Sequence, residues 1–430
     1  MYTENAFSKV IENVKRYTLN SLIESAIERI LMYDYSMQTS IVLAYLEIVY
    51  READNSKDKI QADKIVFSSI CQNLFELMDI HRFSDFKVHN PAKMFHVLAY
   101  QQFPYQLKTI DSDISRQYFM FSADSSNSKL NSLFIRKYDI SIKQYLDFCS
   151  GFIKANKTNV CDDTAMQILN IWTLEHNDIK RVIQSYSNGI SKDFYKTFSP
   201  DFFIKYPIIK FNEMHVCIDP YLLMRTIREY LFCSVQEFPE AKTNFDKRFQ
   251  QYVNNSLNDS NIDFKTDADL KISGKKECDF LISDFLFSEC KAIKLKPLAQ
   301  VNPDDTILKN NLHDIEIAYM QILSTANRFP NKEYEPFGII ITYLPFYFSD
   351  ATDIWDSIGN SIENFVSENS LEFVIKPENL FFVDIRSWDL LIESLKVNGI
   401  QSLYEMFVKA KRNNSEGNRK MLFSMHFEES

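Results

Sequence analysis

The spacing of apolar and polar positions divides the chain into two parts. In residues 1 to about 200, stretches such as SKVIENVKRYTLNSLIESAIERILMYDY and TSIVLAYLEIVYREADN repeat their apolar residues every three or four positions. This period is typical of amphipathic helices. We therefore expect the N-terminal part of the chain to be mostly helical.

The pattern changes near residue 205, where KYPIIKFNEMHVCIDP reads as a strand, an Asn-Glu turn and a second strand. Asp219 stands where a helix N-cap belongs, and Pro220 stands at the first helical position before YLLMRTIREYLF. Both residue types favour these positions. The segment predicts a hairpin that feeds a helix.

Strands and helices mix from residue 244 onward. The patterns predict helices over 244–257, 310–329 and 357–368, and strands over 264–272, 277–282, 285–293, 337–344 and 380–385. The strand over 337–344 is apolar on both faces, as in a central strand between helix layers. The fold class is thus α/β, with α+β character overall because the N-terminal part is helical.

Three parts are expected along the chain. Residues 1–235 form a helical region ending in the hairpin and its helix, residues 236–395 form a mixed sheet flanked by helices, and residues 396–430 form a helix and a basic tail.

Composition narrows the class of protein. Apolar residues make up 45% and charged residues 25% of the chain, as in ordinary globular proteins. The net charge of −10 does not by itself favour nucleic-acid binding, which depends on a local patch rather than on the sum. The first residues lack the apolar stretch of a signal peptide, and the longest apolar run, FGIIITYLPFYF, is too short to span a bilayer. We expect a cytoplasmic protein with no membrane partner.

Short motifs exclude several kinds of site. The 7 cysteines include no CxxC pair, which argues against structural zinc or a disulfide framework and for a reducing compartment. The 7 histidines show no HxxxH or HExxH spacing. A Walker A loop, GxGxxG and GxSxG are also missing, so ATP hydrolysis and Rossmann-type dinucleotide binding are not expected.

One stretch places charges inside strands that look fit for burial. In ECDFLISDFLFSECKA, residues 277–292, Glu289 and Lys291 share one face of the second strand, with α-carbons roughly 7 Å apart. Asp279 lies on the first strand and faces Glu289 only if the loop between the strands has an odd number of residues, such as Ser283–Phe285, or contains a bulge. A two-residue turn would put Asp279 on the other face.

Asp279, Glu289 and Lys291 suit phosphodiester hydrolysis. Two carboxylates, with the backbone carbonyl of Cys290 as a third oxygen ligand, favour a hard cation such as Mg²⁺ or Mn²⁺. A cation held in this way acidifies water and stabilises charge on a phosphoryl group. Lys291 would orient or deprotonate the attacking water, or pair with the developing negative charge.

The letters alone carry little weight, because a D…E-x-K pattern arises by chance in a chain of this length. Similar acid-x-Lys triplets occur at 85–87, 178–180, 240–242 and 269–271. The context of residues 277–292 is more specific. A helix and a strand precede the two charged strands, and a helix and a strand follow them.

This order of elements, with Asp279 and Glu289-x-Lys291 on adjacent strands, resembles the PD-(D/E)XK nuclease superfamily and its restriction-endonuclease-like fold. The resemblance covers roughly residues 240 to 345. It implies that Asp279 and Glu289 bind the metal and that Lys291 assists the nucleophilic water. Cys278 stands where the motif has proline. Many members carry an acidic residue on the first helix, and Asp246 is the corresponding candidate.

The resemblance implies a metal-dependent endonuclease that acts on DNA or on RNA, including tRNA. The whole chain also resembles single-gene bacterial phage-defence nucleases, in which a toxic nuclease is restrained until infection. This architecture predicts a sensing role for the helical region, a phage protein as trigger, and an oligomer as one possible state. Lys294 and Lys296 are candidate phosphate contacts, although short basic runs are commonly solvated surface.

Three alternatives stay open at this point. In the first, the charges form only a structural ion pair, of Glu289 with Lys291 or Lys271. In the second, the chain keeps the nuclease fold but does not cut, and acts as a nucleic-acid-binding or protein-binding regulatory module. In the third, the chain is a structural adaptor with no nucleic-acid role. The helix over 310–329 adds Asn311, His313, Asp314 and Gln321 near the expected path of a substrate, although each is more often a surface residue.

Overall fold

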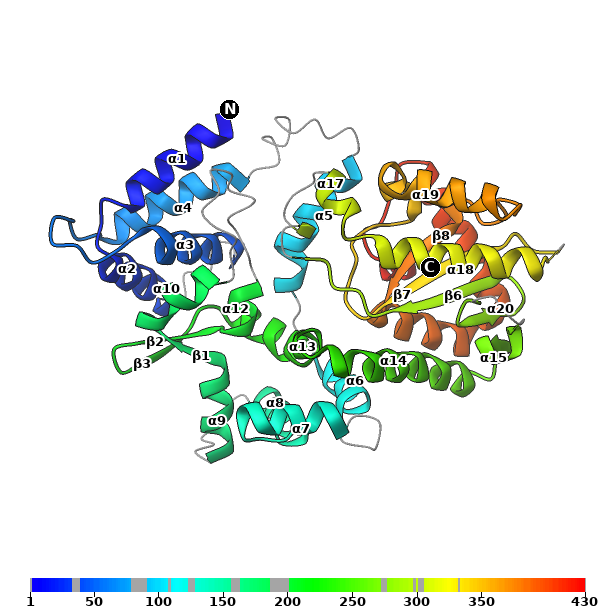
Figure 1. The fold of residues 1–430 in the computed structure, drawn as a ribbon, viewed down its shortest axis with the longest axis horizontal. Coiled ribbons are helices and arrows are strands. Elements are labelled where there is room, and N and C mark those ends of the chain that lie inside the picture. Colours follow the sequence, from blue (N-terminus) through cyan, green and yellow to red (C-terminus); the bar gives the residue numbers. More distant parts are fainter. Residues whose placement is uncertain are drawn as a thin grey trace. The chain divides into compact units, whose positions relative to one another are not determined.

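The computed structural model describes residues 2–32, 39–78, 91–106, 110–122, 128–155, 163–185, 201–271, 277–296, 299–300, 305–331 and 333–429 (Figure 1). Its contacts divide the chain into two compact units, residues 1–87 with 100–244 and residues 88–99 with 245–430. This division differs from the predicted domains in three respects. Residues 88–99 belong to the second unit rather than to the helical region, and residues 236–244 belong to the first unit rather than to the second. Residues 396–430 are part of the second unit rather than a separate region.

The first unit is mainly helical, as its apolar period predicts. Its helices are α1 (Tyr2–Val14), α2 (Leu19–Leu31), α3 (Thr39–Glu52), α4 (Lys64–Met78), α6 (Asp111–Phe121), α7 (Ser128–Tyr138), α8 (Ile142–Ala155), α9 (Asp163–Trp172), α10 (His176–Ser185), α12 (Asp201–Lys205) and α13 (Pro220–Glu237). Helix α5 (Pro91–Gln102) begins among residues of the second unit and ends among residues of the first. The short η2 (Phe103–Tyr105) follows it and belongs to the first unit.

The predicted hairpin of the first unit is confirmed. β2 (Ile208–Phe211) pairs antiparallel with β3 (Met214–Cys217), and β1 (Thr173–Glu175) adds to β2 in parallel. Asp219 caps α13 because its Oδ1 accepts hydrogen bonds from the backbone N–H groups of Tyr221 at 2.7 Å and Leu222 at 3.0 Å. The sequence pattern thus predicts correctly both the hairpin and the start of the helix.

The second unit is a five-stranded mixed sheet covered by helices. Its strands are β4 (Phe264–Thr266), β5 (Phe280–Ile282), β6 (Leu286–Lys291), β7 (Phe337–Thr342) and β8 (Leu380–Asp384), in that spatial order. Pairing is antiparallel from β4 to β6 and parallel from β6 to β8. The helices are α14 (Pro239–Asp259), whose first residues belong to the first unit, α15 (Asp267–Leu270), α17 (Asp305–Lys309), α18 (His313–Arg328), α19 (Trp355–Glu368) and α20 (Ile385–Ser415), with turns η3 (Ala351–Ile354), η4 (Pro377–Asn379) and η5 (Phe423–Glu429).

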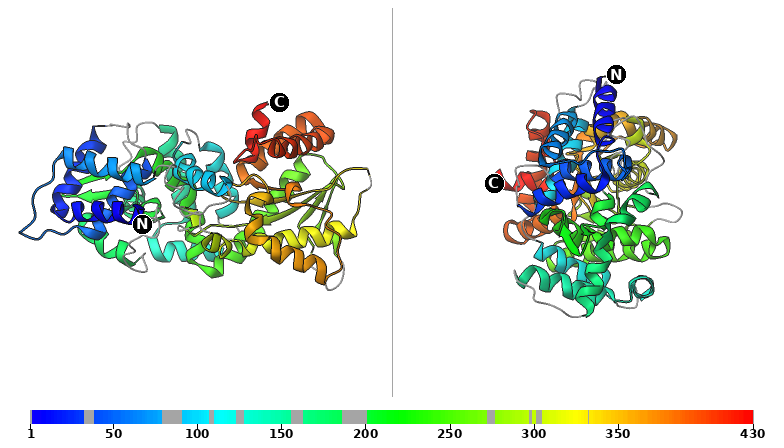
Figure 2. Two further views of the ribbon diagram at one scale, coloured as in Figure 1. Left: turned by 90° about the horizontal axis from the view of Figure 1, so that it is seen from above. Right: turned by 90° about the vertical axis from the view of Figure 1, so that its left-hand side faces the viewer.

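Helices cover both faces of this sheet, with α18 and α19 on one side and α20 on the other (Figure 2, left view, yellow to orange and red). Gly338 of β7 lets α18 approach closely, since a Cβ there would lie 3.1 Å from Ile322 and 2.7 Å from Leu380. On the opposite face, the ring of Phe407 stacks on Phe337 with 5.5 Å between centroids. β7 is fully buried, as its apolar run predicts.

One predicted element is wrong. The pattern predicts a strand over 264–272, but β4 ends at Thr266 and α15 begins at Asp267. Thr266 and Asp269 form a reciprocal capping box, which closes the first turn of a helix at this point. The described helices include none that is long and apolar enough to cross a bilayer.

The C-terminal residues are held to the second unit by a buried acidic pair. Nη2 of Arg419 lies 2.6 Å from Oδ1 of Asp350 and 2.8 Å from Oδ1 of Asp353, and both aspartates are almost fully buried. Asn414 donates from Nδ2 to Oδ2 of Asp350 at 2.6 Å. Burial raises the pKa of Asp353 to about 6, against the opposing effect of Arg419. One arginine therefore pairs with two buried carboxylates.

Replacing Arg419 should destabilise the second unit. Arg419→Ala removes a cation that lies 2.6 and 2.8 Å from two buried carboxylates. We expect a loss of about 2 kcal/mol, less than for a fully buried pair because Arg419 is partly exposed. Urea unfolding measures the change. Arg412→Ala, which removes an exposed arginine of α20, is the matched control and should change stability by less than about 0.5 kcal/mol. Equal effects of the two variants would contradict this role for Arg419.

The same cluster predicts a pH dependence. The folded pKa of Asp353, about 6, lies above the ordinary value of 3.8, so the native state keeps a proton that the unfolded chain releases. This contribution to stability is fully present below about pH 4 and is lost as the pH rises through about 6. We expect the stability of wild type to fall by about 1 kcal/mol relative to Asp353→Asn between pH 5 and 7.5. Parallel pH profiles of unfolding for the two proteins would rule this out.

Candidate catalytic and metal-binding site

The loop between β5 and β6 has the parity that the candidate site requires. Phe280 pairs with Ser288 and Ile282 with Leu286, which leaves the three residues 283–285 between the strands. Continued by one position, this register sets Asp279 opposite Glu289. The condition stated from the sequence is therefore met.

Direct hydrogen bonds connect Asp279, Glu289 and Lys291. The backbone N–H of Asp279 donates to Oε2 of Glu289 at 3.0 Å, and the backbone N–H of Cys290 donates to Oδ2 of Asp279 at 2.7 Å. Nζ of Lys291 lies 2.8 Å from Oε1 of Glu289. Glu289 is 3% exposed, whereas Asp279 is only half-buried. The structure thus brings the three residues into one cluster that reaches the surface at Asp279.

Helix α18 holds this cluster with side chains from successive turns. Gln321 accepts from Nζ of Lys291 at 3.3 Å and donates from Nε2 to the carbonyl of Glu277 at 3.1 Å. One turn later, Oγ1 of Thr325 accepts from the backbone N–H of Cys278 at 2.9 Å. The α18 side chains therefore fix the backbone just before Asp279 as well as the ammonium of Lys291.

Helix α14 contributes a residue that the sequence did not single out. Nε2 of Gln250 donates to Oδ1 of Asp279 at 2.9 Å. The predicted first-helix acid, Asp246, lies one turn earlier and hence on the same face of α14, with its side chain exposed. Gln250 lies four residues after Asp246, so the helix period alone places it on the same face as the predicted acidic residue.

The remaining candidates lie around β6 and the start of α18. Lys294 is half-buried and Lys296 is exposed, and the backbone N–H of Lys296 donates to Oδ1 of Asn311 at 3.2 Å. His313 has an exposed side chain whose Nδ1 lies 3.8 Å from Oε2 of Glu316. The charge of Asp314 acts on Lys291.

Burial dominates the electrostatics of the cluster. It raises the pKa of Asp279 to about 6 and, together with the charge of Asp279, raises that of Glu289 to about 8. Burial alone would lower the pKa of Lys291, but the carboxylate of Glu289 raises it above its ordinary value. Two carboxylates thus share one lysine, and the cluster has an excess of negative charge when both are ionised.

This donor set fits a divalent cation. Asp279 and Glu289 supply hard carboxylate oxygens, each of which keeps a second acceptor position beside its hydrogen bond. The excess negative charge would be neutralised by such an ion. Asp279, Glu289 and the carbonyl of Cys290 are the groups that would hold it. Within the described ranges, no group of three or more His, Cys, Asp or Glu side chains is arranged to bind a metal.

The ion pair of the structural alternative is also present. Lys291 pairs with Glu289 at 2.8 Å, as both interpretations expect. Lys271, the other lysine of that alternative, is exposed. The ion pair is therefore common to a structural and a catalytic role, whereas metal binding is expected only of the catalytic one.

Comparison with protein-family models, with curated proteins and with solved structures finds no match to this chain. Only the residues of the site and their arrangement therefore bear on the function of this chain.

Divalent cations should stabilise the protein through this cluster. If Mg²⁺ or Mn²⁺ binds the folded chain with a Kd near 1 mM, about 10 mM of the ion adds about 1.4 kcal/mol to the free energy of unfolding. Urea unfolding with the ion and with EDTA measures this gain. We expect Asp279→Asn and Glu289→Gln to lose it.

Asp263→Asn, which alters an exposed aspartate of the same unit, should keep the full gain and is the matched control. Stabilisation that persists in both site variants would show that the ion binds elsewhere.

Proposed function

We propose that this protein is a metal-dependent nuclease that hydrolyses phosphodiester bonds, with Asp279, Glu289 and Lys291 as its catalytic residues. The observation that carries the proposal is the hydrogen-bonded cluster of these three residues, assembled by an odd-length hairpin loop and by α18.

The order of elements around the site supports this proposal. Helix α14 comes first, then the antiparallel strands β4, β5 and β6, then α18, then β7 in parallel with β6, with the short helices α15 and α17 inserted after β4 and after β6. Apart from these two short helices, this is the order that the resemblance to PD-(D/E)XK nucleases implies, with the acidic strand and the E-x-K strand adjacent. The resemblance also implies an acidic residue on the first helix. Asp246 lies on α14, and the hydrogen bond to Asp279 comes from Gln250 one turn later.

Each residue has a definite task in the proposed reaction. Asp279 and Glu289 would hold the ion, which supplies acidified water and stabilises negative charge on the phosphoryl group. Gln250 keeps Asp279 oriented, and the backbone of Cys290 fixes its second oxygen. The ammonium of Lys291 has three donors, of which Glu289 and Gln321 take two. Among the residues that the structure describes, the third donor has no hydrogen-bond partner and would be available to water or to a phosphate oxygen.

The substrate would be DNA or RNA, including tRNA. A role as a phage-defence effector, with the helical unit as sensor and a phage protein as trigger, belongs to the same proposal and depends on the combination of a helical unit with this site. Lys294 and Lys296 follow directly after the site on the chain and would contact the substrate backbone.

Nuclease activity is tested directly with the purified full chain. Plasmid DNA, total RNA and tRNA are incubated with Mg²⁺, Mn²⁺ or EDTA, with and without a lysate of phage-infected cells as a source of trigger. We expect metal-dependent cleavage of at least one substrate and a loss of about 100-fold or more in Asp279→Asn and Lys291→Met. The same two variants should relieve any growth arrest caused by overexpression.

Lys271→Met is the matched control, because it removes an exposed lysine of another acid-x-Lys triplet in the same unit. It should keep full activity. If every substrate stays intact under all conditions, including those with infected lysate, or if Lys291→Met cleaves as well as wild type, the proposed reaction is wrong. The noncatalytic binding module would then be the better description.

A further inference from the structure

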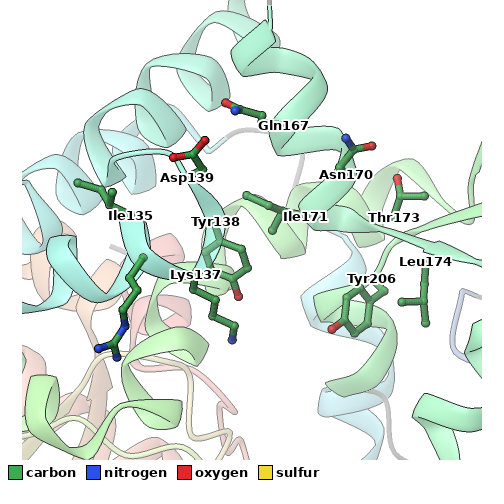
Figure 3. Close-up of a pocket in the computed structure, with 11 residues that line it drawn as sticks. Ile135, Lys137, Tyr138, Asp139, Gln167, Asn170, Ile171, Thr173, Leu174 and Tyr206 are labelled. Atoms are coloured by element: carbon green, nitrogen blue, oxygen red, sulfur yellow. The ribbon is translucent and has the colours of Figure 1, made fainter.

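The first unit contains an open cavity of ≈ 880 Å³, within the size range of small-molecule sites. Residues of α7 and α9 line it together with the start of β1 and the segment before β2 (Figure 3). None of the proposed nuclease residues belongs to it. Its lining includes three pairs of side chains that are able to bind a ligand: two cationic, two aromatic and two amide side chains.

The aromatic pair is Tyr138, at the end of α7, and Tyr206, in the segment before β2 (Figure 3). Both tyrosines are held in place by their neighbours. Tyr138 accepts a hydrogen bond from the hydroxyl of Tyr230 at 2.9 Å, and the ring of Tyr206 packs 5.4 Å from that of Phe202. A lysine ammonium already lies over each ring, that of Lys137 5.0 Å from the Tyr138 centroid and that of Lys205 5.6 Å from the Tyr206 centroid. A flat ring in the ligand would therefore stack on the remaining face of either tyrosine.

The cationic pair makes the cavity attractive to an anion. Arg136 is exposed, and Lys137 shares the carboxylate of Glu237 with Lys205, at 2.9 and 2.7 Å. Two lysines thus offset one glutamate, and Asp139 is the acidic residue of the lining. With Arg136 included, these five side chains leave one net positive charge, and guanidinium groups bind phosphate oxygens in pairs.

The amide pair offers hydrogen bonds. Gln167 and Asn170 lie three residues apart on α9, so both project from the same side of the helix. In the described part of the chain, neither side chain has a hydrogen-bond partner in the protein. Each amide carries both donors and an acceptor, and such groups pair with the polar edges of nucleobases.

We propose that this cavity binds a nucleotide. Arg136 and Lys137 would hold the phosphate, Tyr138 or Tyr206 would stack against the base, and Gln167 and Asn170 would contact the base edge. Inorganic phosphate would use only the cations, and an uncharged aromatic molecule only the rings. A nucleotide is the ligand class that matches all three pairs. The site is one of binding, separate in its residues from the proposed nuclease chemistry.

Calorimetric titration of the full chain tests this in EDTA, so that no hydrolysis contributes. The probes are the ribonucleoside 5′-monophosphates, adenosine and inorganic phosphate, at up to about 10 mM to detect a Kd near 1 mM. We expect saturable binding of at least one monophosphate, with weaker binding of adenosine and phosphate. Arg136→Gln should weaken nucleotide binding by about tenfold. Asn170→Ala should weaken it by about threefold.

Arg181→Gln is the matched control, since Arg181 is an exposed arginine of the same unit outside the cavity lining. It should bind as wild type does. Arg136 and Asn170 are both exposed, so their variants are expected to fold, and circular dichroism confirms this. The proposal is overturned if no monophosphate binds, if Arg136→Gln binds unchanged, or if phosphate binds as tightly as the nucleotides. None of these results depends on whether the chain is a nuclease.

Discussion

The candidate site depends on the length of one loop. Between β5 and β6 the chain turns over residues 283–285, and Ser283 and Asp284 both adopt left-handed backbone angles, with φ of 47° and 59°. This conformation costs roughly 1 kcal/mol for a residue with a side chain. Contacts outside the loop offset that cost, because the N–H of Ser283 donates to Asp263 at 3.0 Å and Lys265 pairs with Asp284 at 2.7 Å. A register shifted by one residue would move Asp279 to the other face. The geometry of the site therefore depends on a strained turn, which β4 and its flanking residues hold in place.

Packing of α18 connects the core of the second unit to the same cluster. The missing side chain at Gly338 allows Ile322 to approach β7, and this sets the distance of the whole helix from the sheet. Gln321, next to Ile322 in the chain, then reaches Lys291 and the carbonyl of Glu277. A change in the core contact would therefore move a polar contact of the site. Fold and chemistry are coupled here through two consecutive residues.

What the sequence predicts depends on the range of the interactions. The order of elements follows from local periodicity, and the parity condition on Asp279 and Glu289 follows from the alternation of a strand. The capping box of Thr266 and Asp269 is also local. The residues around it have a strand-like pattern, however, and for this reason the predicted strand extends too far beyond Thr266. By contrast, the partners of Arg419 lie more than sixty residues earlier in the chain, and no periodicity relates them. The contact of Gln250 with Asp279 also joins distant residues, although the helix period places Gln250 on the same face as the predicted Asp246.

Two pairs of acidic residues in the described part of the second unit lie close together, and their surroundings differ in a way that bears on function. Asp350 and Asp353 are both almost fully buried, and Arg419 closes over them. Asp279, in the other pair, keeps part of its surface exposed, and its opposing glutamate is held by a lysine that is itself partly exposed. A ligand can reach a carboxylate only where some of its surface meets solvent. The first pair is thus suited to holding the C-terminal segment, and the second to binding a group from outside the protein. Buried charge alone would not separate a structural cluster from a reactive one, whereas access to its oxygens does.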